Sequence, residues 1–98
     1  MIRHIVFFKF KPETGERDKE SLAGKLESLK DSIDKIRSLK VGLDVGNKPN
    51  SYDMALDTTF DSMADVDAYS KHPEHVKVLD TIAGICQTTA KVDYESED

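Results

Sequence analysis

The sequence has little cysteine, and it has no long apolar run. Cys86 is the only cysteine among the 98 residues, so the chain can close no intrachain disulfide and build no thiolate metal cluster. We expect its side chain to be buried as a small hydrophobic group. No stretch approaches the about 20 apolar residues that a transmembrane helix needs. The apolar start Ile5–Phe8 is soon followed by Lys9 and Lys11 and lacks the plan of a signal peptide, which predicts a cytoplasmic protein with no membrane partner.

The chain also lacks an excess of positive charge. Its net charge of −5 argues against nucleic acid as a partner. The sequence contains no glycine-rich phosphate loop, no nucleophile elbow and no basic-aromatic RNA-binding pattern. Its hydrophobic content of 38% and charged content of 34% are typical of an ordinary folded protein. Because 98 residues without a repeat or a linker have room for one domain, we expect residues 1–98 to form a single domain.

Hydrophobic patterns predict four strands and a long first helix. Runs rich in Val, Ile and Phe, or strictly alternating apolar residues, predict strands at 2–10, 39–45, 52–60 and 85–95. Leucine and isoleucine recur every three or four positions between residues 18 and 37, which predicts one amphipathic helix with its apolar stripe toward the core.

A second helical region is expected between the third and fourth strands, interrupted at a proline. Asp61 and Ser62 can cap a short helix that runs to His72. Pro73 disfavours a helical backbone at the residue before it and suits the first turn of a new helix, which should end near Gly84. The inward residues of that helix are expected to be Val76, Leu79 and Ile82. The element order is therefore β-α-β-β-α-β, an α+β fold with helices on one side of a four-stranded antiparallel sheet.

The first strand is apolar on both of its faces, which this fold does not explain by itself. His4, Val6 and Phe8 share one face, whereas Ile5 and Phe7 occupy the other. Helices cover only one face of such a sheet, and a half-exposed strand should alternate apolar with polar residues. A second copy of the chain is the simplest cover for Ile5 and Phe7, so we predict a homodimer joined sheet to sheet. A sheet with a mildly apolar exposed face is the alternative.

His75 is the first candidate for chemistry. If Pro73 begins a helix, His75 lies in its first turn, where the positive end of the helix dipole disfavours the imidazolium. A neutral imidazole can accept a proton, so His75 is a candidate general base. The alternative is a structural helix junction in which the histidine only hydrogen-bonds the backbone.

The other polar candidates are less specific. His4 lies on an apolar strand face, where a histidine is usually a core residue whose hydrogen bonds are satisfied rather than a ligand. His4, His72 and His75 lack a recognised metal-ligand spacing, so we expect no metal and no other cofactor. Asp93 shares a strand face with Lys91, but alternation alone does not say which face of the last strand meets the helices.

These residues together resemble the stress-responsive A/B barrel family, a branch of the dimeric α+β barrel proteins. The resemblance rests on segments Arg3–Phe10, Tyr52–Leu56, His72–Val76 and Val92–Tyr94, together with Tyr69, and it spans nearly the whole chain. It implies a ferredoxin-like fold whose sheets pack face to face in a dimer. It also implies likeness to a plant cyclase of this family that performs an intramolecular aldol condensation without a cofactor.

The same resemblance assigns roles to individual residues. His75 matches the cyclase's catalytic histidine and would remove a proton, Asp93 would hold the tautomer of that histidine, and Tyr69 would stabilise a developing oxyanion. Asp93 and Lys91 would then face the helices. The implied pocket is lined by His4, Val6, Phe8, Leu22, Leu26, Leu39, Met54 and Leu56. Met54 stands where the cyclase has a further histidine, and Lys91 replaces an apolar lining residue.

Three functions follow as hypotheses. The first is a small-molecule pocket inside each subunit, used for binding or for cofactor-free acid-base chemistry on a carbonyl compound. The second is a non-enzymatic, stress-related protein that acts through stable homo-oligomeric assembly. The third is a cofactor-free monooxygenase, as in other α+β barrel branches. Whether the protein is an enzyme stays open at this point.

Overall fold

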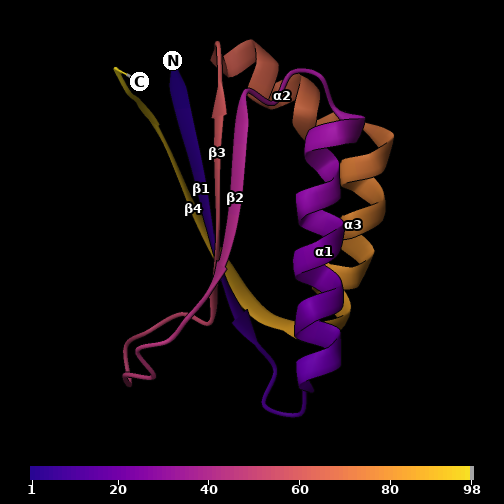
Figure 1. Cartoon of the computed structure of the whole chain (residues 1–98), viewed down its shortest axis with the longest axis vertical. Coiled ribbons are helices and arrows are strands. Elements are labelled where there is room, and N and C mark those ends of the chain that lie inside the picture. The colour runs from indigo at the N-terminus through magenta and orange to yellow at the C-terminus, as the bar shows by residue number, and fades with distance from the viewer. Residues whose placement is uncertain (98) are drawn as a thin grey trace.

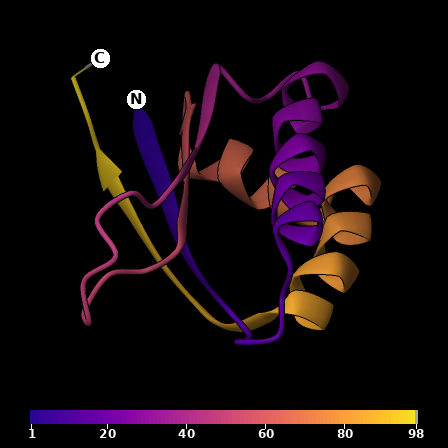
Figure 2. The same ribbon diagram turned by 60° about the horizontal axis from the view of Figure 1, so that its bottom comes forward.

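One antiparallel sheet with helices on a single face makes up the computed structural model, which describes residues 1–97 (Figure 1). The strands are β1 (Ile2–Phe10), β2 (Ser38–Leu43), β3 (Met54–Phe60) and β4 (Cys86–Glu95), and the helices are α1 (Glu16–Ser32), α2 (Met63–Lys71) and α3 (Pro73–Ile85). α1 and α3 lie side by side over the sheet, and α2 lies near one end of it (Figures 1 and 2). The predicted α+β class and βαββαβ order are confirmed.

The sheet has the order β2-β3-β1-β4, so β1 is central and β4 is an edge strand. His4 lies opposite Thr58 of β3 and Asp93 of β4 in this register. β2 ends two residues earlier than the alternation predicted, and Val45 is 94% exposed in the loop that follows. The apolar alternation continues to Val45, but the paired part of β3 begins only at Met54, so no strand remains for Val45 to pair with.

α1 ends at Ser32, five residues before the end that the periodicity predicted. Ile33 has an extended backbone and donates its N–H to Leu29, which closes the last turn. Ile33 and Ile36 are nevertheless 1% and 2% exposed. The turn after α1 therefore packs against the same core as the helix, which is why its apolar spacing looked helical.

The junction between α2 and α3 follows the local chemistry of the sequence. The Ser62 hydroxyl accepts a hydrogen bond from the Asp65 N–H (3.2 Å) and so caps α2. His72 is the residue between the two helices, and its Nδ1 accepts the N–H of Glu74 (3.1 Å) at the start of α3. Pro73 occupies the first turn, where its missing N–H costs no helical hydrogen bond. This junction places His75 in the first turn of α3, as predicted.

The inward side of α3 differs from the expectation at Val76 and at Leu79. Val76 is 48% exposed, whereas Val78 is 6% exposed and belongs to the core. Ile82 packs against the core as predicted, and Leu79 is 43% exposed. A short helix with apolar residues at several neighbouring positions offers more than one candidate stripe, and the packing against α1 selects the one that contains Val78.

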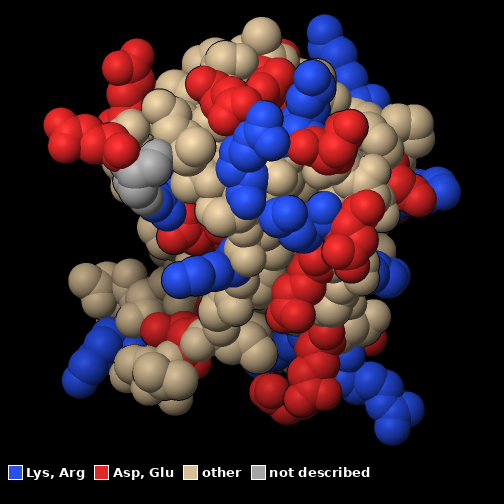
Figure 3. All heavy atoms as spheres, turned by 45° about the horizontal axis from the view of Figure 1, so that its top comes forward, with Lys and Arg blue, Asp and Glu red and all other residues tan. Residues whose placement is uncertain are grey.

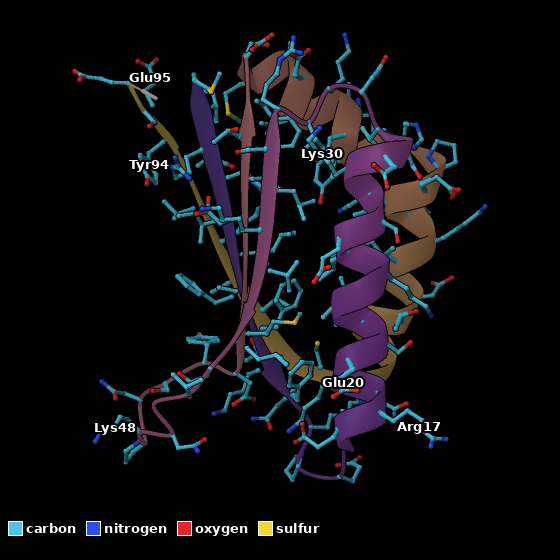
Figure 4. All side chains as sticks on the ribbon, viewed as in Figure 1. Arg17, Glu20, Lys30, Lys48, Tyr94 and Glu95 are labelled. Atoms are coloured by element: carbon cyan, nitrogen blue, oxygen red, sulfur yellow. The ribbon has the colours of Figure 1, made fainter. Side chains whose placement is uncertain are left out.

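The core lies between the sheet and the helices. Its side chains come from every strand face that meets the helices and from the inner sides of α1, α2 and α3 (Figure 4). Leu22, Thr58 and Phe60 are all fully buried there. Cys86 is 8% exposed, which confirms its expected burial. Burial of a leucine or phenylalanine side chain stabilises a fold by about 1.5–3 kcal/mol, so this layer holds the helices on the sheet.

The opposite face of the sheet carries no helix (Figures 1 and 2). Phe7 of β1 is 38% exposed there, and its ring lies 5.7 Å from the ring of Tyr52. Val92 and Tyr94 of β4 are 48% and 45% exposed, and Tyr94 points away from the helices in Figure 4. The loop of residues 44–53, between β2 and β3, extends on this same side. We call the side of the sheet that carries Ile5, Phe7, Val92 and Tyr94 the open face.

Charged side chains of both signs are interspersed on the face shown in Figure 3. Several of them pair: the Arg37 guanidinium donates to Asp61 (2.5 and 3.0 Å), which lowers the pKa of that carboxyl. Such exposed pairs contribute little to stability because water competes for both partners. Within residues 1–97, none of the helices has the length and apolar content required to cross a bilayer.

Candidate active site

A cavity of about 170 Å³ lies between the sheet and the helices α2 and α3. Polar side chains reach it from four elements: His4 on β1, Tyr69 on α2, His75 on α3, and Lys91 on β4. The full lining consists of His4, Val6, Phe8, Leu26, Leu56, Tyr69, Ser70, His75, Leu79, Ile82, Thr89 and Lys91. A mostly apolar hollow with a few converging polar groups is the usual form of a small-molecule site.

His75 is held by the backbone of the preceding helix. Its Nδ1 lies 3.0 Å from the carbonyl oxygen of Ser70, and because a carbonyl only accepts, Nδ1 carries the proton. The lone pair of a neutral ring is then on Nε2. Burial lowers the pKa of His75, an effect that the hydrogen bond to Ser70 partly offsets and that His4, His72 and Lys91 reinforce. The ring is therefore neutral near pH 7 and able to accept a proton at Nε2.

Tyr69 lies against His75, with 4.4 Å between the two ring centroids. Its side chain is 1% exposed, and burial raises the pKa of the phenol to about 12, so the hydroxyl keeps its proton at neutral pH. Within residues 1–97, every fully buried side-chain nitrogen or oxygen has a hydrogen-bond partner. The side chain lines the cavity, and no hydrogen bond of its hydroxyl is found within residues 1–97. The hydroxyl is a free hydrogen-bond donor.

Asp93 is bound to His4, its neighbour across β1 and β4. The Asp93 carboxylate accepts a hydrogen bond from Nδ1 of His4, whose side chain is 7% exposed. Asp93 faces the helices, as the family resemblance implied, but the expected hydrogen bond to His75 is not found among residues 1–97. The group that fixes the His75 tautomer is instead the carbonyl of Ser70. The ring of His4 packs edge-on against Tyr69, with 5.9 Å between centroids.

Five of the eight residues expected to line the pocket do so: His4, Val6, Phe8, Leu26 and Leu56. The other three, Leu22, Leu39 and Met54, lie elsewhere: Leu22 and Met54 are buried in the core and Leu39 packs against it. The cavity is bordered by β1, β3 and β4, whereas Leu39 lies on β2 at the far edge of the sheet. This position explains why a helix-facing side chain on β2 does not reach it.

The lining also contains Ser70, Leu79, Ile82 and Thr89, which were not predicted as pocket residues. Thr89 lies on the same face of β4 as Lys91, so strand alternation could have identified it. Ser70 holds His75 through its backbone carbonyl, for which a sequence carries no signal. Among residues 1–97, no three His, Cys, Asp or Glu side chains gather as metal ligands. The polar side chains that meet the cavity include a neutral imidazole (His75), a hydrogen-bond donor (Tyr69) and a cation (Lys91).

Comparison with known proteins identifies relatives of the same size and fold. Residues 2–96 match the family described as the stress responsive A/B barrel domain. Olivetolic acid cyclase of Cannabis sativa is 28% identical over 95 residues, which cover 95% of this chain and 94% of the cyclase. A dimeric protein of unknown function with a ferredoxin-like fold, from Bacteroides fragilis, is 34% identical and covers 97% of this chain and 95% of its own, with a TM-score of 0.85. A dimeric ferredoxin-like protein of unknown function from Thermobifida fusca is 26% identical, covers 97% and 90%, and has a TM-score of 0.88.

The chain belongs to the stress-responsive A/B barrel family, because the match extends over nearly its whole length. The predicted family and the predicted ferredoxin-like fold are therefore confirmed.

Proposed function

We propose that this member of the stress-responsive A/B barrel family is a homodimer in which each subunit binds a small carbonyl compound and removes a proton beside the carbonyl group. Nε2 of His75 takes the proton from the α-carbon. The electron pair of the broken C–H bond forms the C=C bond of an enolate, and the negative charge moves to the carbonyl oxygen. Tyr69 donates its O–H to that oxygen, and no cofactor takes part.

The arrangement of His75 is the observation that carries this proposal. The ring meets the cavity, burial lowers its pKa, and the hydrogen bond to Ser70 leaves Nε2 without a proton. A general base needs all three properties: access to substrate, a neutral form at working pH and a free lone pair. A histidine that served only as a helix junction would need none of them; His72 fills that structural role in this chain.

Tyr69 supports the second half of the chemistry. Its hydroxyl is protonated, unpartnered within residues 1–97 and adjacent to His75, so it can donate to an oxygen that gains charge. A donor already fixed in an apolar site is most effective when charge develops on its acceptor. The sequence similarity to olivetolic acid cyclase, which extends over 94% of that enzyme's length, also supports the proposal.

The open face supports the homodimer. Phe7, Val92 and Tyr94 place exposed apolar and aromatic surface on a sheet that has helices on its other side only. Two relatives of at least 26% identity are dimeric proteins. Packing two such faces together would remove this surface from water, which is the main driving force for obligate association.

The test measures proton exchange directly. Incubation with cyclohexanone in D₂O, followed by ¹H NMR, should show loss of the α-proton signal faster than in buffer alone. The cavity of about 170 Å³ is large enough for this probe, because cavities of about 150 Å³ in other proteins accept a six-membered ring. His75→Ala should slow the protein-dependent exchange by about 10²–10⁴-fold, the usual contribution of a general base. Tyr69→Phe should slow it by about 10²-fold.

His72→Asn is the matched control, because asparagine can still accept the Glu74 N–H and cap α3. It should leave the exchange rate unchanged. Equal rates for the parent protein and His75→Ala would refute the acid-base chemistry.

The second candidate, a non-enzymatic assembly protein, is favoured by the open face alone. In that case His75→Ala would be harmless, and light scattering would show heat-stable assemblies larger than a dimer.

A further inference from the structure

Lys91 places a cationic group in the wall of the cavity. It lies on β4 opposite Val6, and both residues line the cavity. Among the described residues 1–97 that line the cavity, Lys91 is the only lysine, arginine, aspartate or glutamate. A lysine on an edge strand ordinarily protects that edge from pairing with another chain, and such a residue needs no ligand. The surroundings of Lys91 point to a second role.

The ammonium group of Lys91 has no carboxylate partner among residues 1–97. Within residues 1–97 the same is true of six other lysines, so the feature that distinguishes Lys91 is its place in the lining of the cavity. The carboxylate next to Lys91 on the same strand face is Asp93, and it accepts its hydrogen bond from His4. Lys91 is an exposed residue, so the cavity has a solvent-accessible cation in its wall with no carboxylate beside it among residues 1–97.

A second, independent feature also points to a ligand. Tyr69, which is 1% exposed, lines the same cavity, and no hydrogen bond of its hydroxyl is found within residues 1–97. A neutral donor suits a carbonyl oxygen, and an ammonium group suits a carboxylate. Lys91 and His75 both line this cavity, so the cation and the base border one site.

We propose that Lys91 favours substrates that carry a carboxylate, so that the site binds a small oxo acid more tightly than a neutral ketone of the same shape. This inference rests on the function proposed above. The carboxylate pairs with Nζ of Lys91 on the β4 side, the carbonyl oxygen accepts the Tyr69 O–H, and the α-carbon between them faces His75. A cavity of about 170 Å³ suits a molecule about the size of benzene, which limits the class to short oxo acids.

The test compares two probes of the same shape, acetoacetate and its neutral analogue acetoacetamide. Titration of ¹⁵N-labelled protein at pH 7.5, followed by NMR, gives a Kd for each probe from the shifts of residues around the cavity. Acetoacetate should bind about fivefold more tightly, the size of effect expected for a partly exposed ion pair. The preference should shrink in high salt, which screens such a pair.

The Lys91→Met variant should bind the two probes equally, with the Kd of acetoacetamide unchanged. Lys91→Arg should keep the preference because it keeps the charge. Lys30→Met removes the same charge from an exposed position on α1 that does not line the cavity, and it should behave as the parent protein (Figure 4). The ¹⁵N spectrum of each variant shows directly whether it is folded.

The outcomes separate this inference from the function on which it rests. Equal binding of both probes to the parent protein, or a preference that survives Lys91→Met, would overturn the role of Lys91 and leave the pocket and its base standing. Failure of both probes to shift any cavity residue would contradict the small-molecule site and the inference together.

Discussion

The two faces of β1 differ in burial. His4 and Phe8 lie on the face covered by the helices and are 6% and 1% exposed. Ile5 and Phe7 of the same strand lie on the open face. Phe7 is 38% exposed. The two faces also use charge differently: Asp93 is bonded to the buried His4, while Asp57 pairs with Arg3 at 2.7 Å on the open face, where their side chains are 37% and 21% exposed.

The difference shows that one strand can build two functional surfaces at once. Alternation of side chains directs every second residue to the covered face, where the cavity lies, and the others to the open face. The covered face combines packing with polar groups that converge on a cavity, and the open face combines apolar surface with solvated charge. Paired substitutions at neighbouring positions can therefore affect one surface and leave the other intact.

The largest expected effect separates the two phenylalanines of β1. Phe8→Ala should lower the free energy of unfolding by about 3–5 kcal/mol, because it removes a large side chain that is 1% exposed and belongs to the core. Phe7→Ala should lower it by less than half of that amount within a subunit, because its ring already meets solvent there. Urea unfolding followed by circular dichroism measures both. Equal losses would mean that the two faces are equally packed.

The next comparison uses two valines with the same 48% exposure, Val92 on the open face and Val76 on α3. Val92→Lys should weaken the proposed dimer by at least about tenfold, because it places a charge in an apolar contact. Val76→Lys should leave association unchanged. Light scattering at micromolar concentration distinguishes dimer from monomer. A parent protein that is monomeric in this measurement would refute the dimer outright.

The third comparison concerns the two carboxylates. Asp93→Asn should cost about 2 kcal/mol, because it weakens a charge-assisted hydrogen bond to a buried histidine. Asp57→Asn should cost less than about 1 kcal/mol, since Arg3 and Asp57 are partly solvated. Both are measured by urea unfolding in the Val92→Lys background, so that dimer contacts do not contribute. A larger loss of unfolding free energy for Asp57→Asn than for Asp93→Asn would contradict the view that the covered face holds the less solvated charge.

Sequence patterns identified the elements and the two faces because these depend on local periodicity. Strand alternation separated His4 and Phe8 from Ile5 and Phe7, and Pro73 located the start of α3. The same periodicity extended α1 too far, because Ile33 in the following turn packs as a helical residue would.

The details of the site depended on tertiary relations that periodicity does not contain. The pairing of Asp93 with His4 follows from the register between β1 and β4, which are far apart in the sequence. The hydrogen bond that fixes His75 comes from the backbone of Ser70, and every residue has such a carbonyl. Met54 faces the helices as expected, yet it lies outside the lining because the cavity occupies only part of that layer.

The smallest expected effect is the pH dependence that His75 gives to the covered face. Burial lowers the pKa of the folded ring below its ordinary value of 6.5, so below about pH 6.5 the unfolded chain binds more protons than the folded one. The free energy of unfolding should therefore fall as the pH drops through this range, and it should be insensitive to this group above it. His75→Asn should remove that part of the dependence, whereas His72→Asn should retain it. Because proton removal needs the neutral ring, the rate of α-proton exchange should decline over the acidic side of the same range, and a rate that rose there would contradict His75 as the base.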